Sequence, residues 1–284
     1  MGLGGKWPGK SGGECVASLR RLMSLDLRPA VSLQSVPMKR RIHLLILTFL
    51  VISLSSALVT GTVSFAAERD NPAMVPVPQT AAWWTVRHEQ VLARSSQGAV
   101  DLLMIGDSIT QGWDDEGRPV WNEYYERRST MNLGFNTDRT EHVLWRLRHG
   151  EIEGLAPKVA VVMIGTNNTG ASQDLPEDTA AGIQAILTTL RARLPGTKIL
   201  LLGIFPCGAS ADDPFRRVNV AINNRLHELA DAHHVFYLDL SQHFLDHEGR
   251  LRQDLLPDLL HPNERGYRVW AEGMEAMLKQ LLDE

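Results

Sequence analysis

From residue 100 to its end, this chain alternates short apolar runs with longer segments of helical periodicity. The five apolar runs, which we expect to form strands, lie at residues 100–105, 130–133, 159–164, 199–204 and 235–238. The segments with helical periodicity lie at residues 121–127, 138–149, 178–194 and 215–233, and a last one begins after Pro262. Uninterrupted apolar strands joined through helices are typical of a parallel sheet covered on both faces. The sequence therefore predicts an α/β fold whose ligands bind at the carboxyl ends of the strands.

The segment at residues 138–149 carries signals for both ends of a helix. Asp138-Arg-Thr-Glu141 has the spacing of a capping box, and Gly150 suits the position that follows a helix. Upstream, residues 71–79 are rich in proline and should run extended on the surface, before a short helix over residues 83–92.

The N-terminal 66 residues differ in charge from the rest of the chain. They carry 8 Lys or Arg and 2 Asp or Glu, whereas the remainder carries 21 and 31. Residues 39–41 are basic, the next 26 residues hold no formal charge, and small side chains stand at Ser64 and Ala66. A basic start, an apolar middle and a small-x-small end are typical of a secretory signal peptide.

This pattern sets the expected domain boundaries. We expect a non-native or disordered extension at residues 1–37, translation starting at Met38, a signal peptide at 38–66 and a folded domain at 67–284. The protein would then be secreted or periplasmic. The alternative is an uncleaved membrane anchor formed by residues 42–67, because 26 uncharged residues are long enough to span a bilayer.

Composition excludes several kinds of protein. The net charge of residues 67–284 is −10, so the domain has no electrostatic footprint for nucleic acid. The chain has two cysteines, Cys15 and Cys207, which excludes a disulfide framework and a four-thiolate metal site. Residues 4–11 satisfy the phosphate-loop pattern, but no strand can precede them, so we assign them no nucleotide.

Chemically useful residues stand directly after the predicted strands. Ser108 follows the first strand at a turn into a helix, where a hydroxyl can project above the sheet. Gly134 follows the second strand and Asn167 the third, and a backbone N–H with a side-chain amide can stabilise an oxyanion. Asp258 and His261 precede the last helix, at a spacing that lets the carboxylate orient the imidazole. Together these residues predict serine-based acyl transfer.

The same segments give the chain a family resemblance. Gly-Asp-Ser at residues 106–108, Asn-Leu-Gly-Phe at 132–135, Glu-His-Val-Leu-Trp-Arg-Leu at 141–147, Gly-Thr-Asn-Asn at 165–168 and Leu-His-Pro at 260–262 occur in this order. The sequence resembles the SGNH, or GDSL, hydrolase superfamily, and within it the catalytic α subunits of platelet-activating-factor acetylhydrolase and their secreted bacterial relatives. The resemblance implies a flavodoxin-like three-layer α/β/α sandwich with a five-stranded parallel sheet.

The resemblance also implies catalytic roles for individual residues. Ser108 would be the nucleophile and His261 the general base, oriented by Asp258. The oxyanion hole would consist of Ser108, Gly134 and Asn167. No cofactor and no metal would take part in the reaction.

Further implications concern the substrate and the assembly. The side chains of Ile109, Thr166 and Leu260 would form the wall of the acyl pocket, and bulky groups there favour short acyl chains. The α subunits have a glycine pair where this chain has Asn136 and Thr137, so its preference for the leaving group should differ. The resemblance also suggests a homodimer.

The sequence thus predicts a secreted serine esterase that removes short acyl groups, chiefly acetyl, from carbohydrate. Its partner would be a small-molecule or polysaccharide acyl ester, with membrane contact only if the leader is kept. The alternatives are a lysophospholipase or lipase, an activity like that of the platelet-activating-factor acetylhydrolases, and a non-catalytic interaction module. Trp83, Trp84 and Trp113 could line a substrate groove, although aromatic residues on short helices more often belong to the core.

Overall fold

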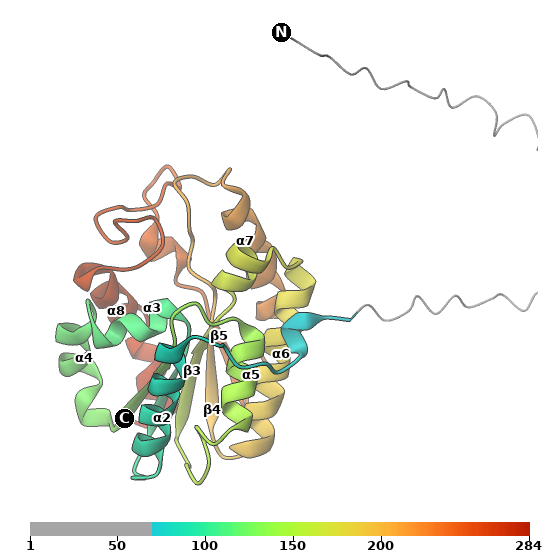
Figure 1. The fold of residues 1–284 in the computed structure, drawn as a ribbon. Coiled ribbons are helices and arrows are strands. Elements are labelled where there is room, and N and C mark those ends of the chain that lie inside the picture. The colour runs from blue at the N-terminus through green and yellow to red at the C-terminus, as the bar shows by residue number, and fades with distance from the viewer. Residues whose placement is uncertain (1–69) are drawn as a thin grey trace, which may run out of the picture. The chain divides into compact units, whose positions relative to one another are not determined.

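Five parallel strands form the centre of the structure, a computed structural model that describes residues 70–284 (Figure 1). The strands are Leu102–Gly106 (β1), Thr130–Gly134 (β2), Val159–Met163 (β3), Lys198–Leu202 (β4) and Val235–Leu238 (β5). Their order in the sheet is β2-β1-β3-β4-β5, which confirms the expected fold class. The expected extension, leader, anchor and phosphate-loop-like segment lie outside the described residues.

Helices cover both faces of this sheet (Figure 1). One face packs against α2 (Ala82–Ser95), α5 (Thr140–Arg148), α6 (Pro176–Arg193) and α7 (Pro214–His227). The other packs against α4 (Arg118–Tyr124) and α8 (Glu264–Leu282), while the short α3 (Ser108–Gln111) follows β1. Short 3-10 segments lie at Pro72–Met74, Gly112–Asp114, Glu126–Arg128 and Ser241–Phe244, and a π-helical turn lies at Asn168–Ser172. In the described residues, no helix is both long and apolar enough to cross a membrane.

The predicted strands agree with the observed ones to within two residues at each end, because each apolar run is a strand buried on both faces. One helix was predicted too long. α7 ends at His227, six residues before the expected end at residue 233. The carboxylate of Asp231 accepts the backbone N–H groups of Val235, His234 and His233, and these bonds hold its pKa well below the usual range. This turn leads the chain into β5 instead of extending the helix.

The predicted capping box of α5 is also wrong. The N-cap is Arg139, whose backbone N–H donates to His142 Nδ1 at 3.0 Å. Burial, together with the guanidinium groups of Arg139 and Arg146, lowers the pKa of His142 to about 4, so the ring is neutral and can accept. Asp138 turns its carboxylate into the protein and bonds Arg146, a partner that local sequence rules do not include. The end of the helix agrees with expectation, since Gly150 follows the C-cap with a φ of +101°.

The tryptophans on the short helices belong mainly to the core. Trp84 and Trp113 are 2% and 0% exposed, whereas Trp83 is 43% exposed. Trp84 packs on the α2 face of the sheet, and Trp113 packs against Tyr267 and Trp270 on the α8 face. Only Trp83 of these three is therefore free to contact a ligand.

Candidate active site

Ser108, His261 and Asp258 form a hydrogen-bonded chain at the carboxyl edge of the sheet. Ser108 Oγ lies 3.0 Å from His261 Nε2, and His261 Nδ1 lies 2.7 Å from Asp258 Oδ2. Ser108 is the first residue of α3, directly after β1, while the other two residues precede α8. The order and distances are those in which an imidazole can take the proton of a hydroxyl while a carboxylate orients the ring.

Asp258 is held by the short segment that also carries the imidazole. Its Oδ1 accepts the backbone N–H of Leu260 at 3.0 Å and that of His261 at 2.7 Å. Burial raises the pKa of Asp258, but the hydrogen bonds from the side chain and backbone of His261 and from Leu260 N–H outweigh burial and hold it below its usual range. The carboxylate is therefore ionised at neutral pH and fixes the orientation of the ring.

Asp107 fixes the backbone next to Ser108. The side chain is 1% exposed, and its Oδ1 accepts the backbone N–H of Ile109 at 3.0 Å, which caps α3. Burial raises the pKa of Asp107 to about 7, with a contribution from the nearby charge of Asp138 and against the hydrogen bond from Ile109. A carboxyl group that titrates near neutrality thus lies beside Ser108.

Gly134 occupies a position that only glycine can fill. A Cβ atom there would lie 2.1 Å from the backbone nitrogen of Gln111, so its absence allows β2 to pack directly against α3. However, the N–H of Gly134 already donates to Asn132 Oδ1 at 2.9 Å, and Gly134 does not line the cavity that contains Ser108. The N–H of Gly134, which we expected to be an oxyanion donor, thus already has a partner in Asn132, and this favours a different backbone donor.

Thr137 has a backbone N–H without a hydrogen-bond partner among the described residues. The residue lines the cavity that contains Ser108. Its φ of +58° lies in the left-handed region, which a β-branched residue rarely adopts. The resemblance places a glycine pair here in related proteins, and this conformation is the one that glycine favours. Sequence reasoning noticed the substitution but not the donor.

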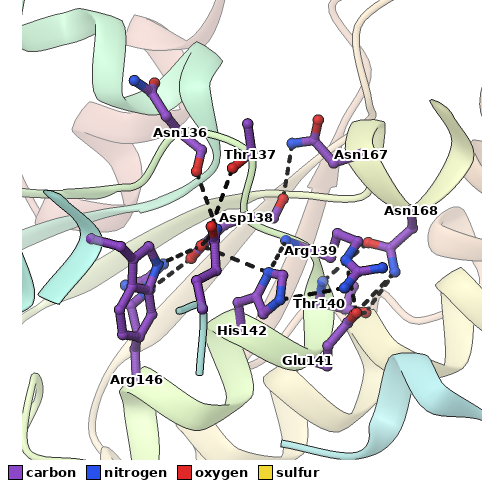
Figure 2. Close-up of polar contacts among 12 residues, drawn as sticks. Asn136, Thr137, Asp138, Arg139, Thr140, Glu141, His142, Arg146, Asn167 and Asn168 are labelled. Carbon is purple, nitrogen blue, oxygen red and sulfur yellow. Dashed lines mark hydrogen bonds and ion pairs between the residues drawn. The ribbon is translucent and has the colours of Figure 1, made fainter. Parts of the chain in front are cut away.

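Asn167 lies on the other side of the same cavity, after β3. Its Nδ2 donates to the backbone carbonyl of Asp138 at 2.9 Å (Figure 2). An amide nitrogen has two hydrogens, so one orients the side chain and the other is available to a ligand.

Asp138 is the centre of a buried network that supports both sides of this arrangement (Figure 2). Its Oδ1 accepts Trp84 Nε1 at 2.8 Å and Gln79 Nε2 at 2.7 Å, and its Oδ2 accepts Arg146 Nε at 2.8 Å. Burial raises the pKa of Asp138 to about 6, against the charge of Arg146 and these hydrogen bonds. Arg146 in turn bonds Glu151, so the buried cation has two carboxylate partners.

The cavity beside Ser108 has a volume of about 450 Å³, and its wall combines polar side chains with a larger area of apolar atoms. The side chains that bear on the chemistry are Ser108, His261, Asn136, Thr137, Asn167 and Leu260, and two carboxylates, Asp115 and Glu116, stand on the same wall.

A second cavity, of about 320 Å³, adjoins the first and shares Asn167 and Leu260 with it. Thr166 lines this second cavity and not the first, together with the more apolar Phe215 and Leu259. Ile109 lines neither cavity, because its side chain is 1% exposed and packs into the core on the α8 face. Leu260 therefore lies between the two cavities, and the three residues expected to form one wall are separated.

Three supporting residues were missed by sequence reasoning. Gln79, Asp138 and Thr137 contact one another, yet Gln79 is 58 residues from Thr137 in the chain. A lone Gln in a proline-rich segment gives no signal of such a contact. No cluster of three or more His, Cys, Asp or Glu side chains within residues 70–284 has the arrangement of a metal site.

Comparison with known proteins agrees with this geometry. Residues 104–269 match the GDSL-like Lipase/Acylhydrolase family. The chain is 32% identical over 219 residues to the platelet-activating factor acetylhydrolase IB subunit alpha2 of Rattus norvegicus, which covers 75% of this chain and 93% of that protein. It is 31% identical over 218 residues to the human alpha1 subunit, covering 75% and 92% of the two chains.

Solved structures share the fold. A GDSL-like lipase from Bacteroides thetaiotaomicron has a TM-score of 0.53 at 19% identity, with 70% of this chain and 96% of that chain covered. An acetylxylan esterase from Geobacillus stearothermophilus has a TM-score of 0.51 at 17% identity, with coverage of 65% and 94%. The family match and the extended similarity to the acetylhydrolase subunits establish that this chain belongs to the GDSL-like lipase/acylhydrolase family and is a carboxylic ester hydrolase.

Proposed function

We propose that the protein is a secreted serine esterase that removes short acyl groups, chiefly acetyl, from carbohydrate. The observation that carries the esterase mechanism is the 3.0 Å contact between Ser108 Oγ and His261 Nε2 inside a cavity of about 450 Å³. This volume is within the range of small-molecule sites.

In the first half of the reaction, His261 Nε2 takes the proton of Ser108 while Oγ attacks the ester carbonyl carbon. The resulting oxyanion would accept hydrogen bonds from the backbone N–H of Ser108, the backbone N–H of Thr137 and the free hydrogen of Asn167 Nδ2. His261 then gives its proton to the alcohol oxygen as the carbon–oxygen bond breaks. The alcohol leaves, and the acyl group remains on Ser108.

In the second half, a water molecule replaces the alcohol. His261 removes one proton from the water, the hydroxide attacks the acyl carbon, and the proton returns to Ser108 Oγ as the acid leaves. Asp258 remains ionised throughout and stabilises the imidazolium that forms in each half.

Polar side chains on the wall of the larger cavity support a polar alcohol. His261 lines the larger cavity and not the adjoining one, so the oxygen that receives its proton must lie in the larger cavity. There the alcohol meets Asn136, Thr137 and the carboxylates of Asp115 and Glu116, which can all bond hydroxyl groups. Similarity to the acetylhydrolase subunits supports an acetyl group on the other side of the ester. The expected leader at residues 38–66 supports export.

A second candidate, a lipase or lysophospholipase, is favoured by one observation. The adjoining cavity of about 320 Å³ begins at Leu260 and has Phe215 and Leu259 on its wall, so an acyl chain longer than acetyl could enter it. The two candidates differ in acyl-chain length, which a substrate series measures directly.

The test compares purified protein with its Ser108→Ala variant on p-nitrophenyl acetate, butyrate and octanoate, and on acetylated xylan. The matched control is Ser96→Ala, which replaces an exposed serine at the C-cap of α2. Turnover that needs Ser108 and drops sharply beyond acetate, with acetate released from xylan, supports the proposal. A preference for octanoate favours the lipase. No Ser108-dependent turnover and no labelling of Ser108 by a fluorophosphonate would contradict both and favour an interaction module.

Export needs its own measurement. Expression of the full chain in a Gram-negative host, followed by fractionation and N-terminal sequencing, should give a periplasmic product that begins after Ala66. A membrane-bound product with an intact leader would favour the anchor at residues 42–67, and a cytoplasmic product would refute export.

A further inference from the structure

The backbone of Thr137 is held in a conformation that its side chain disfavours. Its φ of +58° places a β-branched residue in the left-handed region, where the Cβ atom crowds the backbone. Residues in this state persist only where surrounding contacts impose it, and they gather at functional sites. Thr137 lines the cavity of Ser108, so its strain lies where the oxyanion would form.

Gln79 makes three hydrogen bonds to the segment 136–138. Its Nε2 donates to Asp138 Oδ1 at 2.7 Å and to the carbonyl of Asn136 at 3.2 Å, and its Oε1 accepts Thr137 Oγ1 at 3.3 Å. Gln79 comes from the extended segment before α2, and therefore ties a distant part of the chain to three consecutive residues.

Asn136 and Asp138 have hydrogen-bond partners besides Gln79, whereas the side chain of Thr137 has none among the described residues. Trp84 and Arg146 hold the carboxylate of Asp138, and Gln111 Oε1 accepts the N–H of Asn136 at 2.7 Å. The side chain of Thr137 bonds Gln79 alone among the described residues. Removing Gln79 should therefore release the backbone around Thr137, while Trp84 and Arg146 keep the carboxylate of Asp138 in place.

We propose that Gln79 is a positioning residue that holds Thr137 in the left-handed conformation and so presents its N–H to the oxyanion. The inference rests on the proposed esterase function and deepens it, since it explains how a threonine occupies a position where related proteins have glycine. Without Gln79, Thr137 relaxes toward the extended or right-handed region, and its N–H turns away from the substrate oxygen.

The test is a double-mutant comparison in the full chain, with Gln79→Ala, Thr137→Gly and the two combined, assayed on p-nitrophenyl acetate. Because a 1 Å misplacement costs up to 10²-fold, Gln79→Ala should lower kcat about 10- to 100-fold, with a smaller change in KM. In the Thr137→Gly background the same substitution should change kcat less than about 3-fold, because glycine adopts the left-handed region without help. Gln90→Ala, an exposed glutamine on α2, is the control.

An equal loss of kcat in both backgrounds would mean that Gln79 serves only the stability of the fold, and would overturn the proposal. So would unchanged kcat in Gln79→Ala.

A second measurement does not depend on turnover. Hydrogen exchange of peptides spanning residues 135–139 should accelerate in Gln79→Ala, as the bonded amides of Asn136 and Asp138 open, and less so in the combined variant. If the protein has no Ser108-dependent activity, the esterase proposal fails, and exchange alone decides whether Gln79 holds Thr137. Equal acceleration in both backgrounds would then refute the positioning role.

Discussion

The side-chain amide of Asn167 donates to the backbone carbonyl of Asp138 at 2.9 Å (Figure 2). This bond connects the loop after β3 to the loop after β2. Asp138 directly follows Thr137, so the two groups that we propose as oxyanion donors are fixed relative to each other by one contact. Preorganisation of this kind lets donors stabilise charge without moving during the reaction.

Replacing Asn167 with alanine should lower kcat by a factor on the order of 10²–10³, because one oxyanion donor is lost. KM should change less, since the bond strengthens in the transition state. Steady-state kinetics on p-nitrophenyl acetate measures both constants, and Asn122→Ala, an exposed asparagine on α4, is the control. A rise in KM with kcat unchanged would instead assign Asn167 to ground-state binding.

The members of the Ser108–His261–Asp258 chain should contribute unequally. His261→Ala should lower kcat by a factor on the order of 10⁶ and Asp258→Ala by about 10⁴, because the carboxylate acts only through the imidazole. Half of the Asp258 side chain is open to solvent, at 56% exposure, and water can take part of its place. The double variant should be no slower than His261→Ala. Full activity in Asp258→Ala would exclude the orienting role.

The stability of the fold should depend on the titration of Asp107. Its pKa is about 7 in the folded protein, above the ordinary value of 3.8, so the folded state keeps a proton that the unfolded chain releases. Asp107 therefore favours folding below about pH 4, and this contribution is lost as the pH rises to about 7.

The Asp107→Asn variant removes that dependence and keeps the helix cap. Relative to the wild type, its free energy of unfolding should rise between about pH 4 and pH 8 by an amount on the order of 4 kcal/mol. Urea denaturation across this range measures the difference. If the difference in free energy of unfolding between variant and wild type stays constant, or increases as the pH falls, Asp107 is ionised across this range.

Breaking the buried ion network should destabilise the protein strongly. Arg146 is 0% exposed and lies between Asp138 and Glu151, so Arg146→Met leaves two buried carboxylates without their cation. We expect a loss of about 3–5 kcal/mol in the free energy of unfolding. The matched control is Arg193→Met at a surface pair with Glu153, which should change stability far less. If both variants lose a similar amount of free energy of unfolding, the buried ion network does not stabilise the fold more than the surface pair does.

The sequence was sufficient to predict the sheet and to place several candidate site residues at one edge of it. Each strand is an uninterrupted apolar run, and the carboxyl ends of parallel strands meet at one edge. From that rule we expected Ser108 and Asn167 at one edge, and they line the same cavity; the three-residue spacing places Asp258 beside His261.

The remaining parts of the site depend on tertiary contacts that local rules do not describe. Asp138 has the spacing of a capping residue, but a buried bond to Arg146 takes its carboxylate instead. Gly134 looks like an oxyanion donor in sequence, yet the side chain of Asn132 occupies its N–H. A left-handed φ at Thr137 is imposed by Gln79 from another element, and threonine itself carries no marker of it.

Ser108 and His261 are 153 residues apart, and His261 lies three residues before α8, the last helix within residues 70–284. During synthesis the serine leaves the ribosome long before its histidine exists, since chains emerge from the N-terminus. A nascent chain therefore carries Ser108 without its proposed base, and the pair forms only when the segment before α8 packs at the edge of the sheet. In the proposed mechanism, hydrolytic activity thus reports that this later segment has folded onto the earlier one.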